Sequence, residues 1–112
     1  MRGQKTAARY IGVGMKFSFK VFEEGSDKLL AIADSSLVGK SLEDGELCFF
    51  VSKGFYCDKH CDEKEVKKLL NDATIVNAIG KDIIDLLTNE GLIKNDNVIK
   101  ISGVPHAQII SV

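Results

Sequence analysis

The chain has 112 residues, of which 45% are hydrophobic and 28% charged, and its formal net charge is −1. This length and composition are typical of one globular domain with its own core and exclude a disordered protein. No apolar run approaches the roughly 20 residues that a membrane-spanning helix needs. Residues 1–14 also lack the long apolar segment of a secretory signal. We therefore expect a cytoplasmic protein with no membrane partner.

The charge is unevenly distributed along the chain. Residues 1–14 carry Arg2, Lys5 and Arg9 and no acidic residue, which leaves 12 of the 15 basic and all 16 acidic side chains for the remainder. An acidic body does not suit non-specific binding along a nucleic-acid backbone, although the three basic residues could contact RNA. We interpret residues 1–14 as a basic, flexible N-terminal extension and residues 15–112 as the single domain.

The first half of the domain has strand patterns. Residues 16–22 alternate between polar and apolar, residues 24–27 form a turn cluster, and residues 28–33 supply a partner strand. Together they predict a β-hairpin. Residues 46–51 are a nearly continuous apolar run, which predicts a strand buried on both faces. Residues 52–61 are predicted to be a loop.

Two helices are predicted in the second half. Asp62 can cap a helix N-terminus, and Glu65 three residues later completes a capping-box pattern. From Val66 onward, apolar residues recur at helical spacing and give a stripe for the core. Residues 74–79 suit either a strand or a helix, whereas residues 80–90 have the apolar spacing of a second helix.

The chain ends in strand patterns again. Residues 98–101 and 107–111 predict two strands, and Gly103 and Pro105 predict a rigid turn between them. Strands and helices are therefore segregated along the chain, which indicates an α+β fold. We expect a single domain with a mainly antiparallel sheet and two helices inserted between the N-terminal and C-terminal strands.

Polar residues near the C-terminus are the first candidates for a binding site. Pro105 restricts the backbone next to His106, which lowers the entropy cost of placing an imidazole that can donate, accept or bind metal. The period of two along a strand puts Gln108 on the same face as His106. These two side chains could form a small polar site, or they could satisfy backbone groups at the end of the sheet.

Three further residues are candidates for binding. Asn77 lies within an apolar stretch, where a buried amide needs a partner from the backbone, from water or from a ligand. Gly39 permits a bulge or the close approach of another backbone, and Lys40 could pair with an anion or simply be solvated. This Gly-Lys pair lacks the rest of a phosphate loop, which excludes nucleotide hydrolysis of that type. No catalytic residues are specified, and a non-enzymatic role is favoured.

Cys57, His60 and Cys61 are weak candidates for zinc ligands. A structural site needs four ligands, so Cys48 or His106 would have to complete it. The spacing is not that of paired zinc knuckles, and Cys48 is predicted to point into the core. We therefore expect the protein to have no cofactor. The alternative is a zinc ion bound by these residues.

Several segments, taken in order, resemble a known family. They are Leu37-Val38-Gly39-Lys40, Asp44-Gly45-Glu46-Leu47, Phe55-Tyr56, residues 73–80, residues 90–93 and Gly103-Val104-Pro105-His106-Ala107-Gln108. From about residue 15 to residue 112 the chain resembles the small archaeal family catalogued as domain of unknown function 424. The Pro-His-Ala-Gln segment is the most specific part of the match. Residues 57–61 depart from the family's pattern, which argues against a zinc site there.

The resemblance implies an archaeal cytoplasmic protein with no established activity or cofactor and a loose association with translation or RNA processing. It also places motif positions on Gly39, Lys40, Asn77, Gly80, His106 and Gln108. We therefore predict a non-enzymatic binding module that serves translation or RNA metabolism through a protein or RNA partner. The alternative is a small enzyme or ligand-binding protein that uses His106 as a general acid/base. A concave pocket that joins these side chains would favour the alternative, and a flat surface would favour a partner interface.

Overall fold

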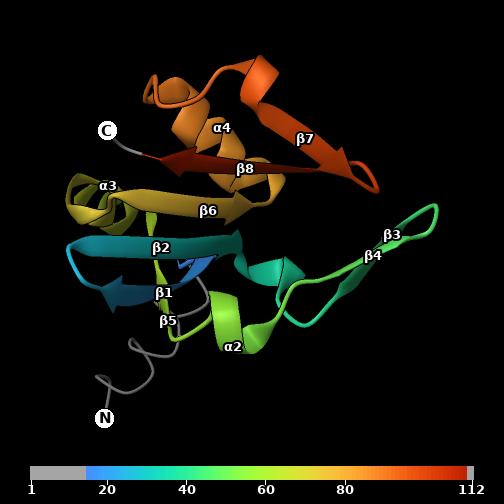
Figure 1. Cartoon of the computed structure of the whole chain (residues 1–112), viewed down its shortest axis with the longest axis horizontal. Coiled ribbons are helices and arrows are strands. Elements are labelled where there is room, and N and C mark those ends of the chain that lie inside the picture. The colour runs from blue at the N-terminus through green and yellow to red at the C-terminus, as the bar shows by residue number, and fades with distance from the viewer. Residues whose placement is uncertain (1–14, 111–112) are drawn as a thin grey trace, which may run out of the picture.

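The computed structural model describes residues 15–110. Six strands form a mixed sheet in the order β5-β1-β2-β6-β8-β7, and a separate two-stranded arm, β3-β4, projects to one side (Figure 1). The strands are β1 (Phe17–Glu24), β2 (Asp27–Asp34), β3 (Ser41–Asp44), β4 (Leu47–Phe50), β5 (Lys59–Cys61), β6 (Ile75–Ile79), β7 (Val98–Ile101) and β8 (Val104–Ile110). The helices are α2 (Lys53–Tyr56), α3 (Glu63–Asp72) and α4 (Lys81–Asn89), with 3₁₀ turns η1 (Ser35–Leu37) and η2 (Asn95–Asn97).

The predicted α+β class is confirmed. Neighbouring strands of the large sheet are antiparallel except for β2 and β6, which are parallel. Helices α3 and α4 cover one face of the sheet, while α2 and the base of the arm pack on the other. None of the helices between residues 15 and 110 is long and apolar enough to cross a membrane. The extension at residues 1–14 lies outside the described residues.

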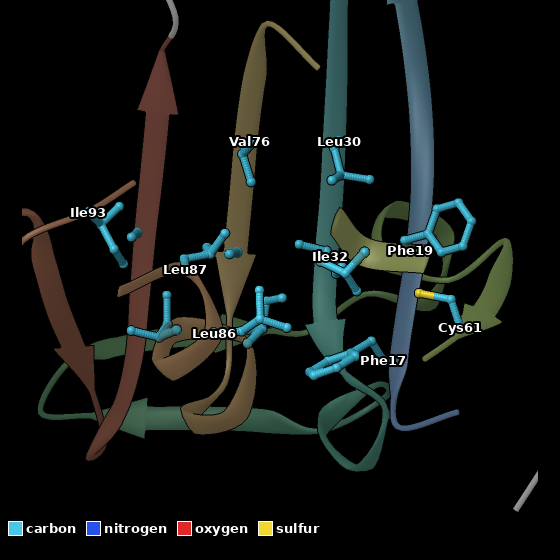
Figure 2. Packing of buried hydrophobic residues seen from close by; sticks show 14 residues of the cluster. Phe17, Phe19, Leu30, Ile32, Cys61, Val76, Leu86, Leu87 and Ile93 are labelled. Carbon is cyan, nitrogen blue, oxygen red and sulfur yellow. The ribbon is translucent and has the colours of Figure 1, made fainter. Parts of the chain in front are cut away.

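The two long helices begin and pack as their sequences predict. The Asp62 carboxylate accepts a hydrogen bond from the Glu65 backbone N–H at 2.9 Å, which satisfies one of the unpaired donors at the start of α3. Val66 of α3 is fully buried. In α4 the buried residues are Ile83, Ile84, Leu86 and Leu87. These side chains join strand residues such as Leu30, Ile32 and Val76 in one core (Figure 2).

The predicted burial of residues 46–51 is wrong for most of the segment. Leu47 and Phe50 are 54% and 55% exposed, and Cys48 is exposed instead of pointing into the core. The reason is that β4 pairs with β3 alone and lies in the arm, where residues on both faces of the ribbon remain in contact with solvent. Only Val51, which follows the strand, is fully buried.

Three other segments differ from the sequence-based expectation or resolve an ambiguity. Residues 52–61 contain the short helix α2 and the strand β5 instead of a loop. Residues 74–79 supply the strand β6, because β-branched side chains fit the pleated centre of a sheet. The final turn is made by Ser102 and Gly103, so that Pro105 lies within β8.

The junction between β6 and α4 is unusually tight. Gly80 has a φ of 128° and a ψ of 150°, a conformation that is essentially restricted to glycine. The Asp34 carboxylate, at the end of β2, accepts hydrogen bonds from the backbone N–H groups of Asp82 and Ile83, both at 2.9 Å. A Cβ on Gly80 would overlap this carboxyl group. Asp34 thus caps α4 from a distant part of the sequence.

This geometry predicts that Gly80→Ala lowers the free energy of unfolding by at least about 3 kcal/mol, because backbone strain and a steric overlap add together. Gly25→Ala is the matched control, since Gly25 has a φ of 62° with open space around it. Strain alone should cost about 1 kcal/mol there. Urea denaturation of both variants checks the difference, and equal losses would contradict the overlap with Asp34.

Candidate functional site

Strand register brings three of the candidate residues together. We call the sheet face opposite α3 and α4 the open face, and it carries Asn77, His106 and Gln108. Asn77 of β6 lies directly opposite Gln108 of β8, and His106 lies opposite Ile79. The three polar side chains are therefore immediate neighbours, which confirms that His106 and Gln108 share one face of their strand.

Small residues in β2 make room for a buried tyrosine beside Asn77. Ala31 and Ala33 are fully buried and face α2, which places Tyr56 against the sheet at 2% exposure. The Tyr56 hydroxyl donates a hydrogen bond to Asn77 Oδ1 at 2.5 Å. The amide that the sequence places in apolar surroundings thus has a partner from α2.

His106 completes a three-residue cluster, which we call the Tyr-Asn-His cluster (Tyr56, Asn77 and His106). Its Nε2 lies 3.2 Å from the same Asn77 Oδ1. Because an amide oxygen can only accept, Nε2 carries the proton and Nδ1 is left as an acceptor. The Phe49 ring from the arm meets the imidazole edge-on, with the ring centroids 5.7 Å apart. The arm therefore partly covers the histidine.

The cluster leaves two polar atoms for an outside partner. Every buried side-chain nitrogen or oxygen between residues 15 and 110 has a hydrogen-bond partner. Asn77 Nδ2 and His106 Nδ1 have none in this part of the chain, so both atoms reach solvent. Gln108 is exposed next to them. The open face therefore presents a donor, an acceptor and a free amide side by side.

Burial keeps the cluster uncharged. Loss of solvent raises the pKa of Tyr56 to about 12 and lowers the pKa of His106 below its usual 6.5. Both shifts favour the neutral form, because a charged group is penalised when water is removed from it. At neutral pH the cluster consequently offers hydrogen bonds and no net charge.

Gly39 and Lys40 lie in the base of the arm. The Gly39 N–H donates to the Val51 carbonyl at 2.7 Å, and the Val51 N–H donates to the Lys40 carbonyl at 2.8 Å. Gly39 has a φ of 89° and open space around its Cα, so the backbone conformation, not a close approach, requires glycine there. The Lys40 side chain is exposed and makes no ion pair with any described residue.

The three weak candidates for zinc binding are separated. Cys57 Sγ and His60 Nε2 lie 3.9 Å apart at the surface, whereas Cys61 is 3% exposed and packs in the core beside Phe19 (Figure 2). Burial and the nearby carboxylates raise the pKa of the Cys61 thiol to about 12, away from the thiolate that binds metal. Residues 15–110 contain no group of three side chains suited to hold a metal ion. Arg2, Lys5 and Arg9 lie outside the described part.

Sequence reasoning missed two members of the site. Tyr56 supplies the hydrogen bond that positions Asn77, and Phe49 covers His106. A tyrosine needs a partner for its hydroxyl when it is buried, but no spacing rule connects residue 56 with residue 77. The two come together only when α2 folds over the alanines of β2.

Comparison with known proteins places the chain in a family. The model of a protein family of unknown function, DUF424, matches residues 22–112. The chain belongs to this family. The family membership predicted from the sequence is thus confirmed. No match is found among curated proteins.

One solved structure has the same fold as this DUF424 chain. It is the crystal structure of an uncharacterized conserved protein from Methanopyrus kandleri, with a TM-score of 0.70 and 22% sequence identity. The alignment covers 86% of this chain and 93% of the other. The two proteins therefore share nearly the whole domain architecture.

The hydrogen bonds of the cluster predict a ranking of two variants. Tyr56→Phe should lower the free energy of unfolding by about 1 kcal/mol, because Asn77 Oδ1 keeps His106 as a donor. Asn77→Ala should cost about 2 kcal/mol or more, because it leaves two donors without an acceptor. Urea denaturation measures both, and the double variant should cost less than the sum of the two. Additive losses would contradict a shared hydrogen bond.

The lowered pKa of His106 predicts a loss of stability in mild acid. The unfolded chain takes up a proton near pH 6.5, before the folded protein does, so acid shifts the equilibrium towards the unfolded state. The free energy of unfolding should fall between about pH 7 and pH 5, and it should fall less steeply in His106→Gln. Denaturation curves over this range test the difference, and parallel curves would show that His106 does not contribute.

Proposed function

We propose that this protein is a non-enzymatic binding module whose open face recognises a protein partner in translation or RNA metabolism, in an archaeal cytoplasm. The observation that carries the proposal is the Tyr-Asn-His cluster. Tyr56 and His106 both donate to Asn77 Oδ1, which fixes Asn77 Nδ2 and His106 Nδ1 at the surface. Preorganised hydrogen-bonding groups lower the entropy cost of binding. The Methanopyrus kandleri relative supports the archaeal setting.

The surroundings of the cluster favour a protein over RNA. Ile99 of β7 lies opposite His106, and Ile110 lies two residues after Gln108, on the same face at the end of β8. These isoleucines are 59% and 66% exposed. Apolar side chains around a few neutral hydrogen-bonding groups are typical of protein interfaces, whereas RNA binding needs cations for the phosphates.

A second candidate function follows from the state of the imidazole. His106 is neutral and its Nδ1 is free to accept a proton, which suits a general base in a small enzyme or a ligand-binding protein. Among the described residues, the Asn77 amide forms a hydrogen bond with the ring and the Phe49 side chain meets it edge-on, and neither of these groups is a nucleophile. A small ligand that shifts the NMR signals of His106 saturably, and does not bind His106→Gln, would favour this candidate.

The double variant Gln108→Ala/Ile110→Ser tests the proposed partner interface. Both side chains are exposed, so the fold should be retained. Tagged wild-type protein is expected to enrich a component of the translation or RNA machinery from native extract, and the double variant should bind the purified component at least about tenfold more weakly. Leu92→Ser is the matched control, because Leu92 is 45% exposed outside the open face.

Three outcomes would overturn the proposal. The first is that no such component is enriched over the control. The second is that the double variant binds the purified component as tightly as the wild-type protein does. The third is that the partner is RNA alone. Sequencing would identify this RNA, and its enrichment would be lost completely after ribonuclease treatment.

A further inference from the structure

Part of strand β1 has a neighbour on one side only. β2 pairs with β1 along its whole length, from Phe17 to Glu24. On the other side β5 pairs with Phe17–Phe19 alone. Among the described residues, the second half of β1 therefore forms an open edge of the sheet.

Hydrogen bonds at both sides of β1 show which backbone groups face that edge. The Lys16 carbonyl accepts from Ser35 N–H on the β2 side, and the Phe19 carbonyl accepts from Asp58 N–H on the β5 side. Backbone groups of successive residues alternate in direction along a strand. The N–H and C=O groups of Val21 and Glu23 therefore point to the open edge, which we call the β1 edge, and no described residue pairs with them.

A cavity of about 320 Å³ lies beside the β1 edge, on the face covered by α3. Its wall includes Val21, which is 38% exposed. Apolar side chains from the sheet, from α3 and from the residue that ends this helix supply much of its lining: Phe19, Val21, Leu30, Leu69 and Ala73. The cavity is large enough for one apolar side chain.

The rim of the cavity carries more acidic than basic groups. Its carboxylates are Glu23, Glu65 and Asp72, and its lysines are Lys28 and Lys59. Lys28 Nζ is bound to Asp72 at 3.0 Å. The carboxylates of Glu23 and Glu65 consequently face one lysine that has no ion pair with a described residue, Lys59. This excess of negative charge favours a ligand that has a basic group next to its apolar side chain.

We propose that the β1 edge binds an extended segment of a partner protein as an added strand, with an apolar side chain in the cavity and a flanking lysine or arginine near Glu23 or Glu65. Unpaired N–H and C=O groups in alternation are matched by another polypeptide backbone, which lipids and nucleic acids lack. Strand addition obtains affinity from main-chain hydrogen bonds and specificity from pockets for alternate side chains. This site is separate from the open face and does not depend on the proposed function.

Amide hydrogen exchange tests the proposal on the full-length protein. In the free protein, the amides of Val21 and Glu23 should exchange fast, whereas those of Lys20 and Phe22, which face β2, should be protected. The probes are three capped heptapeptides of alternating sequence with lysine at both ends and Leu, Met or Phe in the centre. At least one peptide at millimolar concentration should protect the Val21 and Glu23 amides.

Two controls separate strand addition from other kinds of binding. The same peptides with N-methyl groups on the amides that face β1 cannot donate hydrogen bonds and should bind at least about tenfold more weakly. Val21→Lys should weaken binding of the unmodified peptide by a similar factor, because it places a cation beside a basic ligand. Leu92→Lys makes the same kind of change at an exposed residue elsewhere and should leave binding unchanged.

The exchange experiment can also overturn the proposal. If the Val21 and Glu23 amides are protected from exchange in the absence of peptide, another part of this chain covers the edge. If this protection grows with protein concentration, a second copy of the chain covers it. Absence of protection by all three peptides, or equal binding of the N-methylated ones, would reject strand addition. None of these outcomes bears on the open face, which is tested by other variants.

Discussion

The arrangement of this domain depends on the contact between the Asp34 carboxylate and the N-terminus of α4. β2 and β6 are parallel, so their C-terminal ends meet at the same side of the sheet, where Asp34 accepts hydrogen bonds from two backbone N–H groups in the first turn of α4. Burial raises the pKa of Asp34, and the two backbone donors oppose this change. Gly80 is required because its missing side chain leaves space for the carboxylate. This contact connects the hairpin of β1 and β2 to the helix that covers β6 and β8, and it brings the two parts of the chain into one core.

The polar cluster follows from the same central pairing. With β6 held between β2 and β8, Asn77 lies beside Gln108 on one strand and Ala31 on the other. The small alanine admits Tyr56, whose hydroxyl needs an acceptor once it is buried. Asn77 supplies that acceptor and also takes the hydrogen bond of His106. The Asn77 amide is thus tolerated inside the sheet, because its oxygen accepts two hydrogen bonds and its nitrogen remains in contact with solvent.

The two candidate interaction surfaces use different chemistry. The open face presents side-chain groups that are fixed by neighbours, between exposed isoleucines. The β1 edge presents backbone groups that no described residue pairs with, beside an apolar cavity. Between residues 15 and 110, neither surface gathers the lysines and arginines that a nucleic acid would need, in agreement with the acidic composition beyond residue 14. Both features support the proposals that these surfaces recognise protein.

The sequence by itself determined the elements that rest on local periodicity. These are the hairpin of β1 and β2, the capped helix after Asp62, the second helix before Gly91, and the shared face of His106 and Gln108. Tertiary structure decided what depends on contacts between distant residues. Residues 46–51 look buried by composition, yet most of them lie in an arm, because β4 pairs with β3 and not with a strand of the large sheet. Asp34 reaches Gly80 and Tyr56 reaches Asn77 only when β2 and β6 pair, and no local pattern encodes that pairing. The sequence could therefore identify His106, Gln108 and Asn77 as polar residues that need partners, but only the folded chain decides which partners they have.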